Sequence, residues 1–86
     1  MTAFERLVEA IDVHFAATRG ERDTLRAQWS LGRQSFEVEA AGAHRAELRI
    51  LHGALRPTVM NYDTRLDDLD AFVGNVRGTL VDDHAA

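Results

Sequence analysis

The sequence predicts an α+β fold with an N-terminal helix, a four-stranded antiparallel meander sheet, and a C-terminal helix packed on one face of that sheet. Three observations support this class. Apolar residues recur with helical spacing near both ends of the chain. Between the two helices, short runs alternate apolar and polar residues, which is the period of a half-buried strand. Glycines separate these runs at intervals typical of strands joined by tight turns: Gly20, Gly32, Gly42 and Gly53.

The first helix is predicted over residues 2–19. Thr2 and Glu5 have the spacing of a capping box, in which two free backbone amides at the helix start are hydrogen-bonded by side chains. One apolar face follows the helical period and consists of Phe4, Leu7, Val8, Ile11 and Phe15. Arg19 in the last turn and Gly20 after it are typical of a helix C-terminus.

Four strands are predicted to follow, over residues 24–31, 35–40, 45–51 and 55–62. The apolar faces of the first three contain Leu25, Ala27, Trp29 and Leu31, then Phe36, Val38 and Ala40, then Ala46, Leu48 and Ile50. Segment 33–43 would also tolerate a short helix that ends at Gly42, so both interpretations stay open there. The fourth run sets Leu55, Pro57 and Val59 opposite Arg56, Thr58 and Met60. Because Pro57 cannot donate a ladder hydrogen bond, this strand is predicted to be at a sheet edge or to begin there.

The second helix is predicted over residues 64–81, with Asp63 or Thr64 as its cap. Acidic residues near its positive end and Arg77 near its negative end suit the helix dipole. Its apolar seam consists of Leu66, Leu69, Val73, Val76 and Leu80. Residues 82–86 are expected to form a frayed acidic tail.

Composition sets limits on the chemistry of this single domain of 86 residues, 1–86. The chain contains neither cysteine nor lysine, which excludes disulfides, cysteine-based zinc sites and any side-chain amine for a Schiff base. Its net charge of −4 falls on residues 63–86, which argues against nucleic-acid binding, since that requires a basic face. We see no apolar run of membrane-spanning length and no secretory signal at the N-terminus, so we expect a cytoplasmic protein without membrane contact.

The residue types that usually carry catalysis lack the spacing that catalysis needs. The four histidines, His14, His44, His52 and His84, show no tight metal-binding spacing, and His14 is expected at the border of the helix core. Neither serine, Ser30 or Ser35, lies in a nucleophile elbow. We therefore predict no catalytic, cofactor-binding or metal-binding residues, and a chain that is not an enzyme by itself.

One sheet face is expected to meet solvent or a partner, since an antiparallel sheet can carry both helices on its other face. That face would present Arg26, Gln28, Glu37, Glu39, Glu47 and Arg49. The candidate partner-binding residues are Arg26, Gln28, Arg49, Arg56 and Tyr62. For Tyr62, packing against the start of the second helix is the alternative. Trp29 is predicted to belong to the core, with a ligand platform as its alternative.

One segment resembles a known family. Residues 54–80, which begin with ALRPTVMNYDTRLDDLDAFV at 54–73, resemble the C-terminal end of fold-type-I pyridoxal-phosphate enzymes, and most closely the group II amino-acid decarboxylase-like branch. The matching residues are Leu55, Arg56, Asn61, Thr64, Asp68, Leu69 and Asp70. The resemblance implies a strand and helix of the small domain that closes over the cofactor, with an arginine at the place of Arg56 near the substrate carboxylate in some relatives. The large cofactor-binding domain and the aldimine lysine are both missing from this sequence.

These observations favour a small non-catalytic protein-interaction module or accessory subunit that binds itself, as a homodimer, or a larger protein. The alternative is a small subunit that completes a split pyridoxal-phosphate-dependent, decarboxylase-like enzyme in trans. A stand-alone metal-dependent or hydrolytic enzyme is disfavoured by the missing constellations described above.

Overall fold

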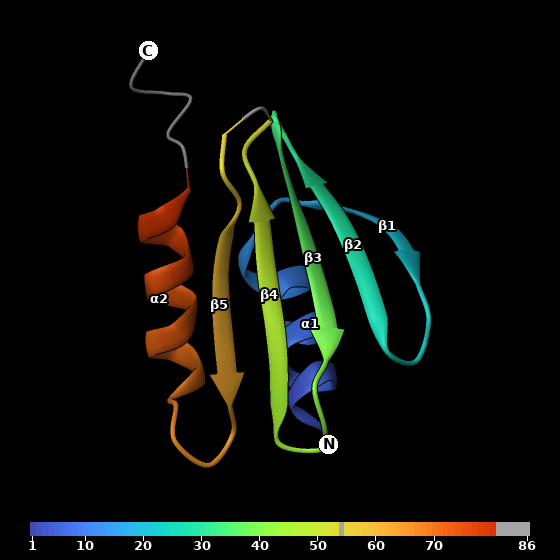
Figure 1. Ribbon diagram of the computed structural model, residues 1–86, viewed down its shortest axis with the longest axis vertical. Helices are drawn as coiled ribbons and strands as arrows, with labels where there is room; N and C mark the ends of the chain where they lie inside the picture. Colours follow the sequence, from blue (N-terminus) through green and yellow to red (C-terminus); the bar gives the residue numbers. More distant parts are fainter. Residues whose placement is uncertain (54, 81–86) are drawn as a thin grey trace.

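In the described part of the chain, five antiparallel strands in sequential order form one sheet, with one helix before it and one after it (Figure 1). The computed structural model describes residues 1–53 and 55–80. Its elements are α1 (Ala3–His14), β1 (Thr18–Arg22), β2 (Arg26–Leu31), β3 (Gln34–Ala40), β4 (Arg45–Leu51), β5 (Thr58–Asp63) and α2 (Leu69–Thr79). The predicted α+β class is confirmed, with five strands in place of four. The tail predicted at 82–86 lies outside the described residues.

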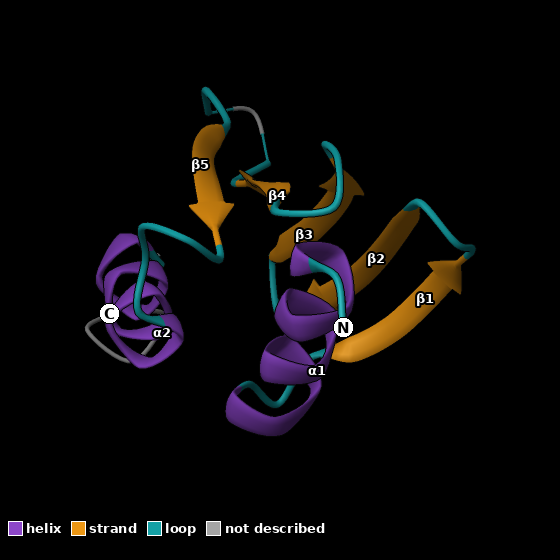
Figure 2. Ribbon diagram, turned by 90° about the horizontal axis from the view of Figure 1, so that it is seen from below, coloured by secondary structure: helices purple, strands orange, loops and turns teal. Residues whose placement is uncertain are grey.

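Both helices lie on the same side of the sheet (Figure 2). Helix α1 packs against β3 and β4, and it also contacts α2 and β5. Helix α2 lies beside α1 and β5, where Phe72 meets Tyr62 with ring centroids 5.3 Å apart. We call the side that carries the helices the inner face and the opposite side the outer face.

The core lies between α1 and the inner face. The largest fully buried side chains are Trp29, Phe36, Leu7, Ile11, Leu48, Ile50, Val38 and Val76. Their positions confirm the predicted apolar faces of β2, β3 and β4. Trp29 is 1% exposed, which confirms the core prediction for this residue. Segment 33–43, for which strand and helix both remained open, forms β3.

The first helix ends at His14, earlier than predicted, because the backbone becomes extended at Phe15 and then enters the sheet as β1. Phe15 has extended backbone angles, φ −124° and ψ 142°, and its ring packs edge-on against Phe36 at 5.5 Å between centroids. The predicted helix end at Arg19 is therefore wrong. All five residues of β1 are exposed, so this strand shows no apolar alternation that could have revealed it.

The ends of three further elements also differ from the prediction. Leu25, predicted on the apolar face of the first strand, is 63% exposed because β2 begins after it. Strand β5 begins after Pro57, as expected for a residue without an N–H, and it turns Met60 rather than Val59 toward the core. The second helix begins at Leu69 rather than at residue 64, and its cap is Asp68, whose carboxylate accepts a hydrogen bond from the Ala71 N–H at 3.1 Å.

Candidate functional site

The outer face of the sheet gathers most of the candidate partner-binding residues. The cross-strand register places the following side chains on it: Arg26, Gln28, Ser30, Ser35, Glu37, Glu39, Arg45, Glu47, Arg49, Leu51, Val59 and Asn61. The six residues predicted for this face are all among them. Arg26, Gln28 and Arg49 therefore lie on one continuous surface, although they come from two strands separated by β3.

Charged side chains on the outer face are paired within the surface. Arg26 donates to Glu39 at 3.2 Å and Gln28 donates to Glu37 at 3.3 Å, in both cases across the β2–β3 pair. Arg49 donates to Glu47 at 3.0 Å on the same strand. Glu39 and Glu47 stand directly opposite each other, and such like-charge pairs are unfavourable unless a cation lies nearby. The flanking arginines supply that cation, so the surface is polar with alternating charge.

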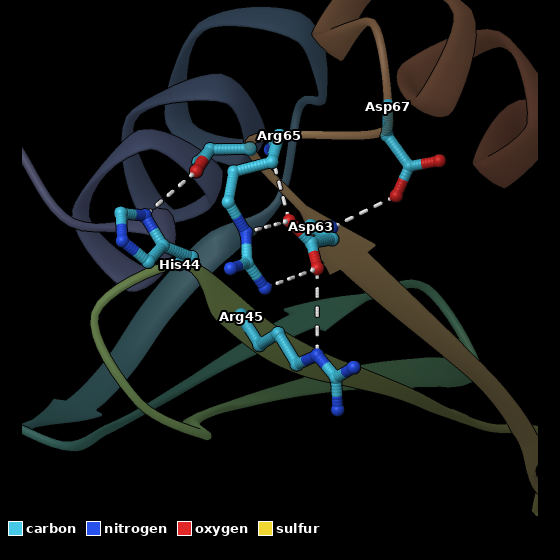
Figure 3. Close-up of polar contacts among 6 residues, drawn as sticks. His44, Arg45, Asp63, Arg65 and Asp67 are labelled. Atoms are coloured by element: carbon cyan, nitrogen blue, oxygen red, sulfur yellow. Dashed lines mark hydrogen bonds and ion pairs between the residues drawn. The ribbon is translucent and has the colours of Figure 1, made fainter.

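A second polar cluster surrounds Asp63 at the end of β5, where the chain turns toward α2 (Figure 3). The Asp63 carboxylate accepts hydrogen bonds from the Arg65 N–H at 2.9 Å and from the Arg65 guanidinium at 3.3 Å. Arg45, the cross-strand neighbour on β4, donates to the same carboxylate at 3.4 Å. Asp67 in turn accepts from the Asp63 N–H at 2.8 Å. His44 and Thr64 are in contact at the limit of hydrogen-bond distance, 3.5 Å.

Asp63 organises this turn as an ionised carboxylate. The hydrogen bonds from the Arg65 side chain and backbone lower the pKa of Asp63 from its usual 3.8 to about 2, against the opposing effect of burial. Both guanidiniums keep side-chain surface exposed, 64% for Arg45 and 60% for Arg65. The cluster therefore fixes the path of residues 63–67, and its geometry assigns it a structural role.

The pKa of Asp63 predicts an acid-dependent contribution to stability. Because the pKa in the folded chain lies below that in the unfolded chain, the carboxylate stabilises the fold above about pH 4, and this contribution is lost as the pH falls toward 2. Asp63→Asn is expected to lower the urea midpoint at pH 6 and to approach the wild-type midpoint at pH 2. Urea titrations followed by circular dichroism measure this, with Glu9→Gln on the exposed side of α1 as the control for the change of charge. A deficit that stays constant from pH 6 to pH 2 contradicts the assignment.

A third polar cluster joins α1 to the sheet. The Trp29 indole N–H donates to Asp12 at 2.9 Å, and Arg19 forms an ion pair with the same carboxylate. Burial opposes the charged form of Asp12, but the hydrogen bonds from Trp29 and Arg19 hold its pKa below the usual value. The predicted helix over residues 2–19 hides this cluster, because Arg19 lies on β1 rather than in the helix.

Among the described residues, His14, His44 and His52 do not converge on a metal site. His52 is hydrogen-bonded through its two ring nitrogens to Gln34 at 3.1 Å and Thr58 at 3.0 Å, so it braces the end of β4 against β5. His44 lies at the opposite end of β4, beside Thr64. Within residues 1–53 and 55–80, no group of three or more histidine, aspartate or glutamate side chains is arranged to hold a metal ion. His84 is outside the described residues.

The two other candidate residues lie away from the surface that holds Arg26, Gln28 and Arg49. Tyr62 faces inward, is 3% exposed, and packs against Phe72 near the start of α2, which favours packing over contact with a partner. Arg56 is exposed in the connection between β4 and β5. Of the residues in the family resemblance, Arg56 and Thr64 flank β5 at its two ends, so the strand separates them.

Comparison with known proteins adds no constraint to this geometry. Neither helix of the described chain is long and apolar enough to cross a membrane. No protein-family model, no curated protein and no solved structure matches the chain.

Proposed function

We propose that the chain is a small non-catalytic protein-interaction module, or an accessory subunit, that binds its partner through the outer face of the sheet. The observation that carries this proposal is the position of both helices on the inner face, which leaves a surface of four adjacent strands, β2 to β5, without cover from the rest of the described chain. Antiparallel sheets of this kind commonly leave one face in water. The sheet thereby holds a broad set of side chains in a fixed register.

The chemistry of the outer face indicates a polar partner surface. Its cations and anions alternate across the strands, with Arg26 beside Glu39 and Arg49 beside Glu47. Surfaces of this type gain orientation and association rate from complementary charge more than they gain affinity. Binding is therefore expected to weaken as ionic strength rises, because exposed charges are screened over about 10 Å at 0.1 M salt.

Affinity purification from the native host with paired variants tests the proposal. The double variant Arg26→Gln/Arg49→Gln removes two cations from the outer face. The matched control, Arg6→Gln/Arg33→Gln, removes two exposed cations from α1 and from the β2–β3 turn. We expect a partner identified by mass spectrometry to be retained by the wild type and the control and lost with the outer-face variant. If all three proteins retain the partner equally, or if no specific partner is found, the proposal that the outer face is the binding surface is rejected.

The same experiment separates out the pyridoxal-phosphate version of this proposal. What supports that version is the order of β5 followed by α2, which is the order that the family resemblance implies. A split enzyme predicts co-purification of a larger chain whose absorbance shows bound pyridoxal phosphate. If the co-purified partner lacks that absorbance, the split-enzyme proposal is ruled out and the interaction module remains as the proposed function.

A further inference from the structure

The two edges of the sheet differ in how they are protected. An edge strand exposes unpaired backbone N–H and C=O groups that can pair with another chain, and proteins commonly guard such edges with charges and bulges. Strand β1 has both devices. All five of its residues are exposed, three of them are charged (Arg19, Glu21 and Arg22), and its register with β2 is interrupted between Arg19 and Arg22.

Strand β5, at the other edge, has no interruption in its register and carries no charge before its last residue, Asp63. Its register with β4 runs without interruption from Thr58 to Asp63. Residues 58–62, Thr-Val-Met-Asn-Tyr, are uncharged and rich in residues that favour strands. Helix α2 lies alongside β5 on the side away from β4 (Figure 1) and on the inner side of the sheet (Figure 2), and it contacts the strand through the rings of Phe72 and Tyr62 rather than through the backbone groups of the edge.

The hydrogen bonds of β5 show which of its backbone groups point toward the open edge. The Thr64 N–H donates to the His44 carbonyl at 2.9 Å, and in an antiparallel ladder hydrogen-bonded pairs alternate with non-hydrogen-bonded ones. Thr58, Met60 and Tyr62 therefore direct their backbone groups toward β4, and Val59, Asn61 and Asp63 direct theirs outward. The Asp63 N–H confirms this direction, because its acceptor is the Asp67 carboxylate at 2.8 Å rather than β4.

The outward-pointing backbone N–H and C=O groups belong to Val59, Asn61 and Asp63, and those of Asp63 are already hydrogen-bonded. At Asp63, the N–H is bonded to Asp67, and the carbonyl accepts from the Leu66 and Asp67 amides. For Val59 and Asn61, the described part of the chain supplies no partner to the outward N–H and C=O groups. These two residues also place their side chains on the outer face, where Val59 is 50% exposed.

We propose that the β5 edge pairs with β5 of a second copy of this chain, antiparallel and centred on Met60. This inference goes beyond the proposed function, because the backbone edge of β5 is a surface distinct from the outer face. In this register Val59 of each copy stands opposite Asn61 of the other, so the outward backbone groups of both residues become hydrogen-bonded. Inner-face side chains also lie opposite inner-face side chains. Met60 of one copy faces Met60 of the other, and Thr58 of each copy faces Tyr62 of the other.

Charge favours a second copy in this orientation. Near the start of β5 lie the cations Arg56, in the preceding connection, and Arg49, on the neighbouring strand β4, whereas residues 63–70 carry four aspartates and one arginine, a net charge of −3. Antiparallel pairing places the cationic end of one strand beside the anionic end of the other, and the twofold axis repeats this contact. Between the ends, the uncharged residues 58–62 leave no like charges opposite each other.

Light scattering coupled to size-exclusion chromatography tests the pairing over a series of protein concentrations. The wild type is expected to move from the mass of one chain toward twice that mass as concentration rises. Val59→Lys/Asn61→Lys places like charges opposite each other twice and is expected to stay at the mass of one chain. Val13→Lys/Leu25→Lys, at two exposed residues of α1 and of the β1–β2 turn, adds the same charge away from β5 and is the matched control, expected to pair as the wild type does.

Charge exchange distinguishes direct pairing from damage to the fold. Val59→Glu/Asn61→Glu is also expected to be monomeric alone, but a mixture with the Val59→Lys/Asn61→Lys protein is expected to give the paired mass. Within each chain, both double variants gain one favourable and one unfavourable charged neighbour on β4, Arg49 or Glu47, so their folds are equally affected. Failure of the mixture to pair, with both variants folded by circular dichroism, overturns the proposed register.

Amide hydrogen exchange gives a residue-level readout. The Val59 and Asn61 amides are expected to become slower to exchange as concentration rises, while the Asp63 amide, already bonded to Asp67, stays unchanged. A wild type that remains monomeric at the highest concentration overturns the pairing but leaves the outer-face proposal intact. If the wild type alone stays monomeric and a different protein slows exchange of the Val59 and Asn61 amides, the edge belongs to that partner and self-pairing is overturned.

Discussion

Replacing Trp29 with alanine is expected to lower the free energy of unfolding by about 3–5 kcal/mol, the usual cost of removing a large buried aromatic side chain. Trp29 is 1% exposed and lies on the inner face of β2. The substitution leaves a cavity under α1 and also removes the indole N–H that donates to Asp12. Domains commonly have about 5–15 kcal/mol of stability in total, so this substitution is expected to remove a substantial part of it.

Urea unfolding followed by far-ultraviolet circular dichroism measures this effect, since the variant lacks the chain's single tryptophan. Trp29→Phe is the matched control, because it keeps an apolar ring in the core while it loses the hydrogen bond to Asp12. We expect it to lie between the wild type and the alanine variant. If Trp29→Ala is as stable as the wild type, the side chain is not the packed centre of the core.

Leu7→Ala is the second substitution with a large expected effect, a loss of about 2–5 kcal/mol in the free energy of unfolding. Leu7 is 1% exposed and belongs to the apolar side of α1 that covers the sheet. Its removal weakens the contact between the helix and the inner face. Thermal and urea unfolding measure the loss.

Val13→Ala is the control for this helix. Val13 is 71% exposed on the opposite side of α1, so the same kind of truncation there is expected to change stability by no more than about 0.5 kcal/mol. Equal effects of Leu7→Ala and Val13→Ala would contradict the orientation of α1 on the sheet.

The predictable part of the fold was the part in which side-chain burial repeats along the sequence. Strands β3 and β4 bury every second residue, and their predicted bounds match the structure to within one residue. The capping box at Thr2 and Glu5 is present, with Thr2 N–H to Glu5 at 2.9 Å and Glu5 N–H to Thr2 at 3.2 Å. In these elements, local spacing and tertiary packing agree.

The elements that were mispredicted lack such local signals. Strand β1 is held by its hydrogen bonds to β2 and buries none of its residues, so Thr18 and Arg19 were assigned to the preceding helix. The start of α2 was placed too early because several acidic residues in a row can cap a helix. The choice among them depends on Asp63, whose carboxylate is bonded to Arg45 at a distance of 18 residues along the chain.

The candidate surface was predictable as a set of residues but not as a geometry. Alternation alone places Arg26, Gln28 and Arg49 on one face of a sheet. The alternation does not show that β5 pairs with β4 without a bulge. It also does not show that the Asp67 carboxylate accepts a hydrogen bond from the Asp63 N–H. Both properties depend on how separate segments meet, and the open edge at Val59 and Asn61 becomes visible only when they are known.

The unequal edges also limit how large an assembly can become. A sheet with two open edges can add copies at both ends and grow into a filament, because each addition creates a new open edge. Here the interrupted register and charges of β1 close one side of every molecule. Pairing through β5 alone uses up the open edge of both chains at once, so association ends at two copies and a fibre has no site from which to extend.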